Sequence, residues 1–257
     1  MSLVVVVPSQ SGIVIAADSR TGISVGNGVH LFCDIAYKIR ICETPTTVAV
    51  SVTGHGDWYP TIPAGKRSAP QQLAPHLSDT RPLFSLRDRL SAWLNEQPAG
   101  EIDEALINRA RAFCIAEMRA HDFITAMPVG EISRVVLAST RAANVSVCFD
   151  WAVILGDDRI LRCTEVRSCE YRPQDKCDFP IFGATDYVHA HVFGGPQASK
   201  FFSKLDADTA PFVTGIPVRD VTPALALKFA DLLINATSEA MEARPHRFGV
   251  GGRLMHI

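Results

Sequence analysis

The first residue of this chain that could act as a nucleophile is Ser2, which follows Met1 directly and precedes an apolar run at residues 3–7. A serine hydroxyl is a poor nucleophile at neutral pH unless a neighbouring group accepts its proton. An unblocked α-amine is such a group, because its reference pKa of about 8 lies roughly two units below that of a lysine. Serine is small enough for ordinary removal of the preceding methionine. Once exposed, Ser2 would therefore carry its own base.

Three short motifs follow Ser2 in a fixed order. The sequence Ala-Ala-Asp-Ser-Arg occupies residues 16–20, so that Asp18 lies 16 residues after Ser2. Lys38 stands at the start of a later strand-like run, and Gly54 follows the end of another. In type, order and interval these residues resemble the opening of N-terminal-nucleophile hydrolases of the proteasome β-subunit type. The resemblance covers most of the chain and is strongest in residues 2–54 and about 222–257.

The resemblance implies a catalytic role for each of these residues. Ser2 is the expected nucleophile, and Lys38, held charged beside the α-amine by Asp18, would disfavour protonation of that amine. The N–H of Gly54 would bind the oxyanion, an effect of roughly 3 to 4 kcal/mol per donor in acyl-transfer enzymes. The implied reaction is hydrolysis of an amide bond through an acyl-enzyme ester on Ser2.

Two supports that the family provides for the amine are absent from this sequence. The family commonly has a Gly-Ser-Gly segment after its second sheet, and residues 181–187 resemble it but contain no serine. Thr185 is the candidate that could supply a hydroxyl there. The family also often has an Asp and a Ser before its closing Gly-Gly, where this chain has Arg-Phe-Gly-Val at 247–250.

These departures leave three functions open. The first is a peptidase of the threonine-protease kind that uses serine and acts on peptides or proteins. The second is a catalytically silent scaffold subunit, comparable to the α-type subunits of the proteasome. The third is a small-amide hydrolase on the wider N-terminal-nucleophile fold. Among bacterial relatives the heat-shock two-component protease and the Anbu peptidases are the nearest comparisons.

The resemblance also implies partners. Family members assemble into rings or spirals that enclose their active sites, so we expect this chain to form a homo-oligomer. A segment rich in Pro, Ala, Ser and Gln at about 59–82 is interpreted as an inserted loop that could alter the contacts between subunits. Whether an ATP-dependent unfoldase is a partner stays open.

The composition and the residue spacing argue against several other classes of protein. Of the 257 residues 47% are hydrophobic and 20% charged, as in folded globular proteins. The formal charge of -2 gives no strong positive field for nucleic acid or anionic membranes. The apolar run at 3–7 is too short to span a bilayer and no basic residue precedes it, which predicts a cytoplasmic protein. The seven cysteines and eight histidines show no metal-binding spacing, so we expect no metal or cofactor.

Most of the elements that must position these residues are predicted to be strands. The runs at 3–7 and 13–17 predict a hairpin, and 36–41 and 47–52 predict two more strands, giving four strands before any helix. A second strand-rich block at about 134–182 predicts a second sheet. An apolar strand is expected at 253–257.

Helical periodicity and capping residues predict three main helices. Ser85 and the run Glu101-Ile102-Asp103 are start signals for helices over about 85–96 and 101–121. Thr222 and Pro223 begin the strongest helix, and a short helical segment follows residues 183–185. The order indicates one α+β domain over 1–257. The resemblance implies that it is a four-layer αββα sandwich.

Overall fold

The computed structural model describes residues 2–19, 21–24, 30–33, 37–44, 46–58, 82–121, 127–194, 198–242 and 254–256. The predicted N-terminal hairpin is confirmed, with β1 at Leu3–Ser9 and β2 at Gly12–Asp18. These two strands form the centre of a four-stranded antiparallel sheet in the order β13-β1-β2-β14. The outer strands are β13 at Ile181–Gly183 and β14 at Leu254–His256, and β14 confirms the predicted final strand.

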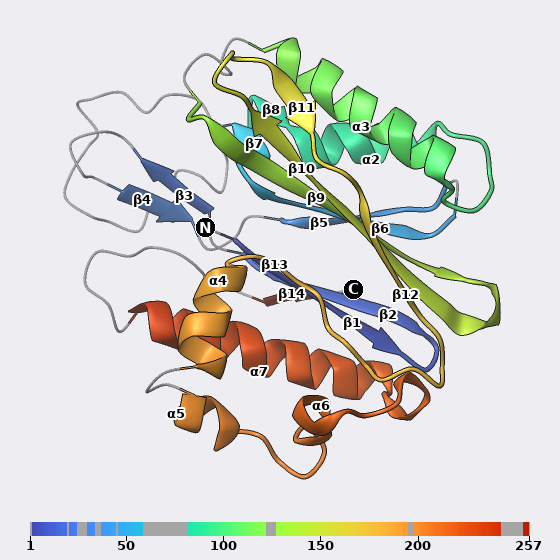
Figure 1. The fold of residues 1–257 in the computed structure, drawn as a ribbon, viewed down its shortest axis with the longest axis vertical. Coiled ribbons are helices and arrows are strands. Elements are labelled where there is room, and N and C mark those ends of the chain that lie inside the picture. Colours follow the sequence, from blue (N-terminus) through green and yellow to red (C-terminus); the bar gives the residue numbers. More distant parts are fainter. Residues whose placement is uncertain are drawn as a thin grey trace.

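A larger sheet contains the remaining long strands in the order β11-β10-β9-β6-β5, with β12 also paired to β10 (Figure 1). Its strands confirm the strand-rich block except at its end, because β13 pairs with β1 in the smaller sheet. The strands are β5 Ile39–Cys42, β6 Val48–Gly54, β9 Gly130–Arg141, β10 Val145–Leu155, β11 Leu161–Cys163 and β12 Arg167–Tyr171.

The prediction of four strands before the first helix is wrong, because eight strands precede α2 in the described part of the chain. The hairpin of β3 at Thr21–Ser24 and β4 at His30–Cys33 was not predicted. Two very short strands, β7 at Asp57–Trp58 and β8 at Phe84–Ser85, pair with each other. Strands this short carry too few residues to show a period of two, so only the pairing reveals them.

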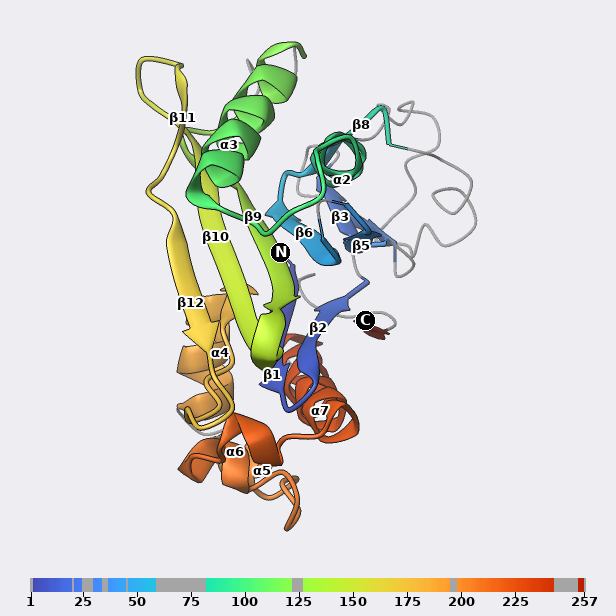
Figure 2. The ribbon, with the colours of Figure 1, turned by 90° about the vertical axis from the view of Figure 1, so that its right-hand side faces the viewer.

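The two predicted middle helices are confirmed as α2 at Leu86–Asn95 and α3 at Glu104–Arg119. Both start where the capping residues predicted: the Ser85 hydroxyl accepts the Asp88 N–H, and the Asp103 carboxylate accepts the Leu106 N–H. Buried apolar residues of both helices share one cluster with β6, β9 and β10. These helices therefore cover the outer face of the larger sheet (Figure 2).

The long predicted C-terminal helix is confirmed as α7 at Pro223–Glu242, with the Thr222 hydroxyl accepting the Leu225 N–H. It runs along the outer face of the smaller sheet (Figure 1). The short helical segment after residue 183 is also confirmed. The remaining helical elements are α4 Thr185–Val188, a π-helical segment His189–Phe193, α5 Ala198–Phe202, α6 Pro211–Thr214, and 3-10 turns at Ala142–Asn144 and Val218–Asp220.

The two sheets pack face to face through a separate apolar cluster. In β1, Leu3, Val5 and Val7 contact the cluster beneath α7, whereas Val4 and Val6 point to the larger sheet. This alternation follows from the period of two in a strand, and burial on both faces explains why residues 3–7 of β1 are all apolar. Strand β1 is thus built into the core of the molecule.

Some sequence predictions lie outside the described residues, notably most of the insertion at 59–82 and the segment at 247–250. Within the described residues, no helix has both the length and the hydropathy that a membrane crossing requires.

Candidate active site

Asp18 ends strand β2 and is completely buried. One carboxylate oxygen, Oδ1, accepts the backbone N–H of Leu3 at 2.8 Å and also contacts the ammonium of Lys38 at 2.8 Å. A buried carboxylate requires such partners, because loss of hydration is otherwise too costly. Through one oxygen, Asp18 joins the start of β1 to a cationic side chain from another part of the sequence.

Lys38 lies immediately before β5 and is only 4% exposed. Its carbonyl oxygen accepts a hydrogen bond from the hydroxyl of Ser51 at 2.8 Å. Ser51 lies in β6 directly opposite Ile39 and is fully buried. This side-chain bond fixes the backbone at the head of β5, and the ammonium of Lys38 then reaches Asp18.

Ser2 is half-buried and its carbonyl lies against Gly183. Gly183 pairs with Leu3 and has a φ of +87°, which favours glycine. A methyl group at Gly183 would lie 2.0 Å from the Ser2 carbonyl oxygen and 3.4 Å from Cβ of Thr53. Only a glycine allows this approach without a shift of the backbone. The start of β1 and the end of β6 therefore meet at Gly183.

Gly54 ends β6, next to Thr53, with a φ of +80°. A methyl group there would lie 2.4 Å from the carbonyl oxygen of Ile132, so this position also requires glycine. The next residue, His55, donates its backbone N–H to the same Ile132 oxygen at 2.8 Å. Loss of hydration, and then the positive charge of the amino terminus, lower the pKa of the His55 imidazole. Gly54 thus lies close to the N-terminal region.

Thr185 is the first residue of α4 and is half-buried. Its hydroxyl donates to the carbonyl oxygen of Ile181 at 2.8 Å, across the turn that follows β13. The hydroxyl proton is therefore used within this turn, while the oxygen can still accept hydrogen bonds.

The structure thus brings Asp18 and Lys38 into direct contact and places Ser2 and Gly54 on elements that converge at Gly183. Gly183 was not among the predicted site residues. Its position in the segment 181–187, which resembles the family's Gly-Ser-Gly, was the signal that could have found it.

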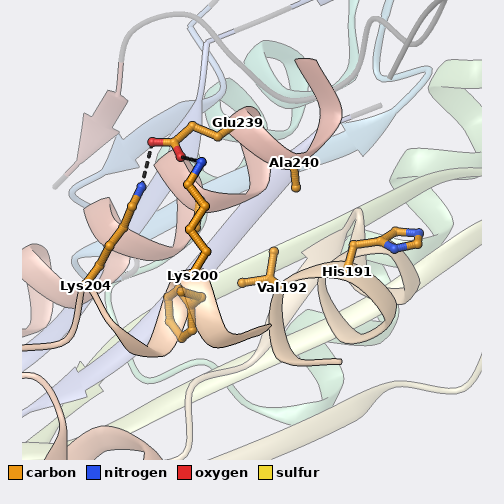
Figure 3. Close-up of a pocket in the computed structure, with 8 residues that line it drawn as sticks. His191, Val192, Lys200, Lys204, Glu239 and Ala240 are labelled. Atoms are coloured by element: carbon orange, nitrogen blue, oxygen red, sulfur yellow. Dashed lines mark hydrogen bonds and ion pairs between the residues drawn. The ribbon is translucent and has the colours of Figure 1, made fainter. Parts of the chain in front are cut away.

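A surface pocket lies elsewhere, among α5, α7 and the π-helical segment (Figure 3). Lys200 and Lys204 extend over it, and both bind the carboxylate of Glu239, at 3.0 and 2.7 Å. His191 lines the same pocket. Both lysines of the pocket share this one carboxylate, and none of the pocket residues belongs to the site around Asp18.

Comparison with known proteins gives structural matches only. No protein-family profile matches the chain, and no curated protein matches its sequence. The solved helical assembly of the Anbu complex from Pseudomonas aeruginosa matches with a TM-score of 0.50 and 13% identity, over 99% of this chain and 80% of that one. Anbu (ancestral β-subunit) from Yersinia bercovieri matches with a TM-score of 0.48 and 14% identity, over 100% and 80%.

At this level of identity the likeness concerns the fold alone, and it spans the whole chain rather than the N-terminal motifs only. It agrees with the resemblance seen in residues 2–54. The chain has the α+β fold of the Anbu type of ancestral proteasome β-subunit.

Proposed function

We propose that the chain is an N-terminal-nucleophile hydrolase that cleaves amide bonds of peptides through an acyl-enzyme on Ser2 after removal of Met1. The observation that carries this proposal is the double contact of Asp18 with the Leu3 N–H and the Lys38 ammonium. Leu3 follows Ser2 directly, so the contact holds the residue adjacent to the nucleophile against a buried ion pair.

In the proposed reaction the α-amine of Ser2 accepts the proton of its own hydroxyl as the oxygen attacks the substrate carbonyl. The Gly54 N–H stabilises the resulting oxyanion. Collapse of the intermediate breaks the C–N bond, and the amine passes its proton to the leaving nitrogen. Water then hydrolyses the ester by the same steps and restores the free hydroxyl. Lys38 favours the neutral form of the amine by its nearby positive charge.

Thr185 enters this proposal as an acceptor for the terminal amine. Its hydroxyl proton is bound by Ile181, which orients the oxygen lone pairs away from that carbonyl. Gly183, two residues earlier, contacts Ser2. A threonine on this turn could therefore replace the serine that the family commonly has in its Gly-Ser-Gly segment.

The alternative function is a catalytically silent assembly subunit. The observation that favours it is the same Thr185 to Ile181 bond, since a hydroxyl satisfied within its own turn has less need of the amine. In this case the Asp18–Lys38 pair would only stabilise the sandwich.

The deciding experiment uses chain isolated from its native host. Mass spectrometry of the intact N-terminus should show loss of Met1, and a peptide epoxyketone should add to Ser2 because it reacts with both the hydroxyl and the α-amine. Ser2→Ala should abolish labelling, whereas Ser203→Ala, at an exposed serine in the turn that follows α5, should retain it. Retained Met1, together with no labelling, would support the scaffold instead.

A substrate panel separates the peptidase from a small-amide hydrolase. Hydrolysis of fluorogenic peptides that depends on Ser2 supports the peptidase. Activity confined to short acyl amides would support the other class.

The proposal extends to architecture and assembly. Helices on the outer faces of two packed sheets support the expected four-layer αββα sandwich, built as one domain over 1–257 with an insertion at 59–82. The relative from P. aeruginosa was solved as a helical assembly, which supports self-association of this chain into a ring or spiral. We place the assembly in the cytoplasm. Light scattering and particle images of the purified protein would test the oligomeric state.

A further inference from the structure

A buried arginine lies behind the segment that follows Gly54. Arg87, in the first turn of α2, is only 4% exposed. Its Nη1 lies 3.6 Å from Oδ2 of Asp57, its Nη2 donates to the Ser85 hydroxyl at 3.4 Å, and its Nε donates to Oδ1 of Asp88 at 3.0 Å. A guanidinium with almost no hydration depends on such anionic partners. Arg87 thus holds Asp57, three residues after Gly54, against the start of α2.

A series of ion pairs connects Arg87 with the strand that follows Lys38. Oδ1 of Asp88 also accepts a hydrogen bond from Nε of Arg40 at 2.8 Å. Arg40 lies in β5, two residues after Lys38. The chain of charges Asp57, Arg87, Asp88 and Arg40 therefore connects the segment after the proposed oxyanion donor with the strand of the proposed catalytic cation.

Backbone bonds hold the same segment at two other points. The Leu86 N–H donates to the Gly56 carbonyl at 2.7 Å, and the His55 N–H donates to the Ile132 carbonyl at 2.8 Å. Asp57 also pairs with Ser85 between β7 and β8. Residues 55–57 are thus joined to α2 and β9, and the side chain of Arg87 is the one charged group that α2 directs to Asp57 among the described residues.

We propose that Arg87 is a positioning residue for the Ser2 site. By holding Asp57 it keeps the turn after Gly54 in the orientation in which the Gly54 N–H faces the carbonyl attacked by Ser2. The inference rests on the proposed function for its catalytic consequence. A misplaced oxyanion donor reduces the stabilisation of the transition state more than it reduces the binding of the substrate. The effect should therefore appear in kcat.

The test compares Arg87→Met with Arg89→Met as the matched control. Arg89 lies on the same helix, is 46% exposed and pairs with Glu117 at 2.6 Å. With a fluorogenic peptide, Arg87→Met should lower kcat by about tenfold to a hundredfold with KM changed less than about twofold. Arg87→Lys should recover part of the loss, and Arg89→Met should match the wild type.

A second variant keeps the test decisive if Arg87→Met folds poorly. Asp57→Asn preserves side-chain size, removes the negative charge and replaces one acceptor oxygen by an NH2 donor, so kcat should also fall. The double variant of Asp57 and Arg87 should be no worse than Arg87→Met, because both substitutions remove one interaction.

Hydrogen exchange separates this inference from the proposed function. Amides of residues 54–58 should exchange faster in Arg87→Met than in Arg89→Met, whether or not the protein is an enzyme. If hydrolysis depends on Ser2 but kcat is equal in the two variants, the positioning role is overturned alone. If hydrolysis does not depend on Ser2, the proposed function is overturned, and equal exchange in the two variants would then overturn the inference as well.

Discussion

Asp18 and Lys38 form a buried ion pair in which Oδ1 and Nζ are 2.8 Å apart, and the same Oδ1 accepts the N–H of Leu3. One atom therefore links the first strand, the second strand and the head of β5. In the proposed mechanism this arrangement sets both the position of Ser2 and the charge beside its amine.

Removal of one partner of this pair should be costly. Lys38→Met leaves the carboxylate of Asp18 buried without its cation, and breaking buried pairs in this way costs about 3–5 kcal/mol of unfolding free energy. Asp18→Asn should also destabilise the fold, because it removes the negative charge that lies 2.8 Å from the buried ammonium of Lys38. The combined variant removes both charges and should regain much of the loss. Urea unfolding measures all three, and strictly additive losses would contradict the coupling. Hydrolysis should be absent from each variant.

Gly183→Ala should disable the site through a steric clash with Ser2, in addition to the backbone strain of a positive φ. The added methyl group meets the Ser2 carbonyl oxygen at 2.0 Å, so residue 2 must shift. Gly130→Ala is the control: Gly130 also has a positive φ, of +116°, but nothing lies within 4 Å of the new methyl group. Both variants carry a backbone cost of roughly 1–2 kcal/mol. Only Gly183→Ala should lose epoxyketone labelling by about a hundredfold or more. Equal labelling rates would argue against the contact.

Thr185 can be tested by the loss of its hydroxyl at nearly constant shape. Thr185→Val removes the bond to Ile181 and the proposed acceptor for the amine, and kcat should fall by roughly tenfold. Thr185→Ser keeps the hydroxyl and should retain most activity. The pH profile of kcat should shift only in the valine variant, because an amine that loses an acceptor for its protonated form has a lower pKa. Profiles of the two variants that coincide would remove Thr185 from the site.

The packing of α7 on the smaller sheet should depend on Phe229. This side chain is fully buried and stacks on Phe212 with the ring centroids 4.3 Å apart. Phe229→Ala should lower the free energy of unfolding by about 3–5 kcal/mol. Phe202, which is 43% exposed in α5, gives the control, and its substitution by alanine should cost less than about 1 kcal/mol. Thermal or urea unfolding followed by circular dichroism measures both.

Because of Asp88, the free energy of unfolding should vary with pH in the acidic range. Partial burial acts to raise its pKa, but the hydrogen bond and charge of Arg87, and then those of Arg40, outweigh this and lower the pKa below 3.8. A carboxyl whose pKa is lower in the folded state stabilises the fold at pH values above its pKa in the unfolded state. This contribution is lost as the pH falls through its pKa in the folded state. The stability advantage of the wild type over Asp88→Asn should therefore be constant near neutrality and shrink below about pH 4. Its pH-dependent part should stay under about 1 kcal/mol, because Asp88 is 38% exposed. An advantage that grows on acidification would contradict this assignment.

Local signals were sufficient for much of the fold. Ser85, Asp103 and Thr222 each start a helix where predicted, since a cap depends on residues only three positions away. The β-branched run of β1 was equally clear. By contrast, β3, β4, β7 and β8 are short and were missed or read as loop.

The sequence by itself predicted the three long helices and the N-terminal hairpin, and the family resemblance carried by Ser2, Asp18, Lys38 and Gly54 proposed the candidate site. The tertiary structure alone decided that one oxygen of Asp18 serves two partners, that β13 joins β1, and that Gly183 and Arg87 lie beside these elements. The physical reason is the range of each interaction. Capping and periodicity act between neighbours in the sequence, whereas ion pairs and strand pairing join residues that only folding brings together.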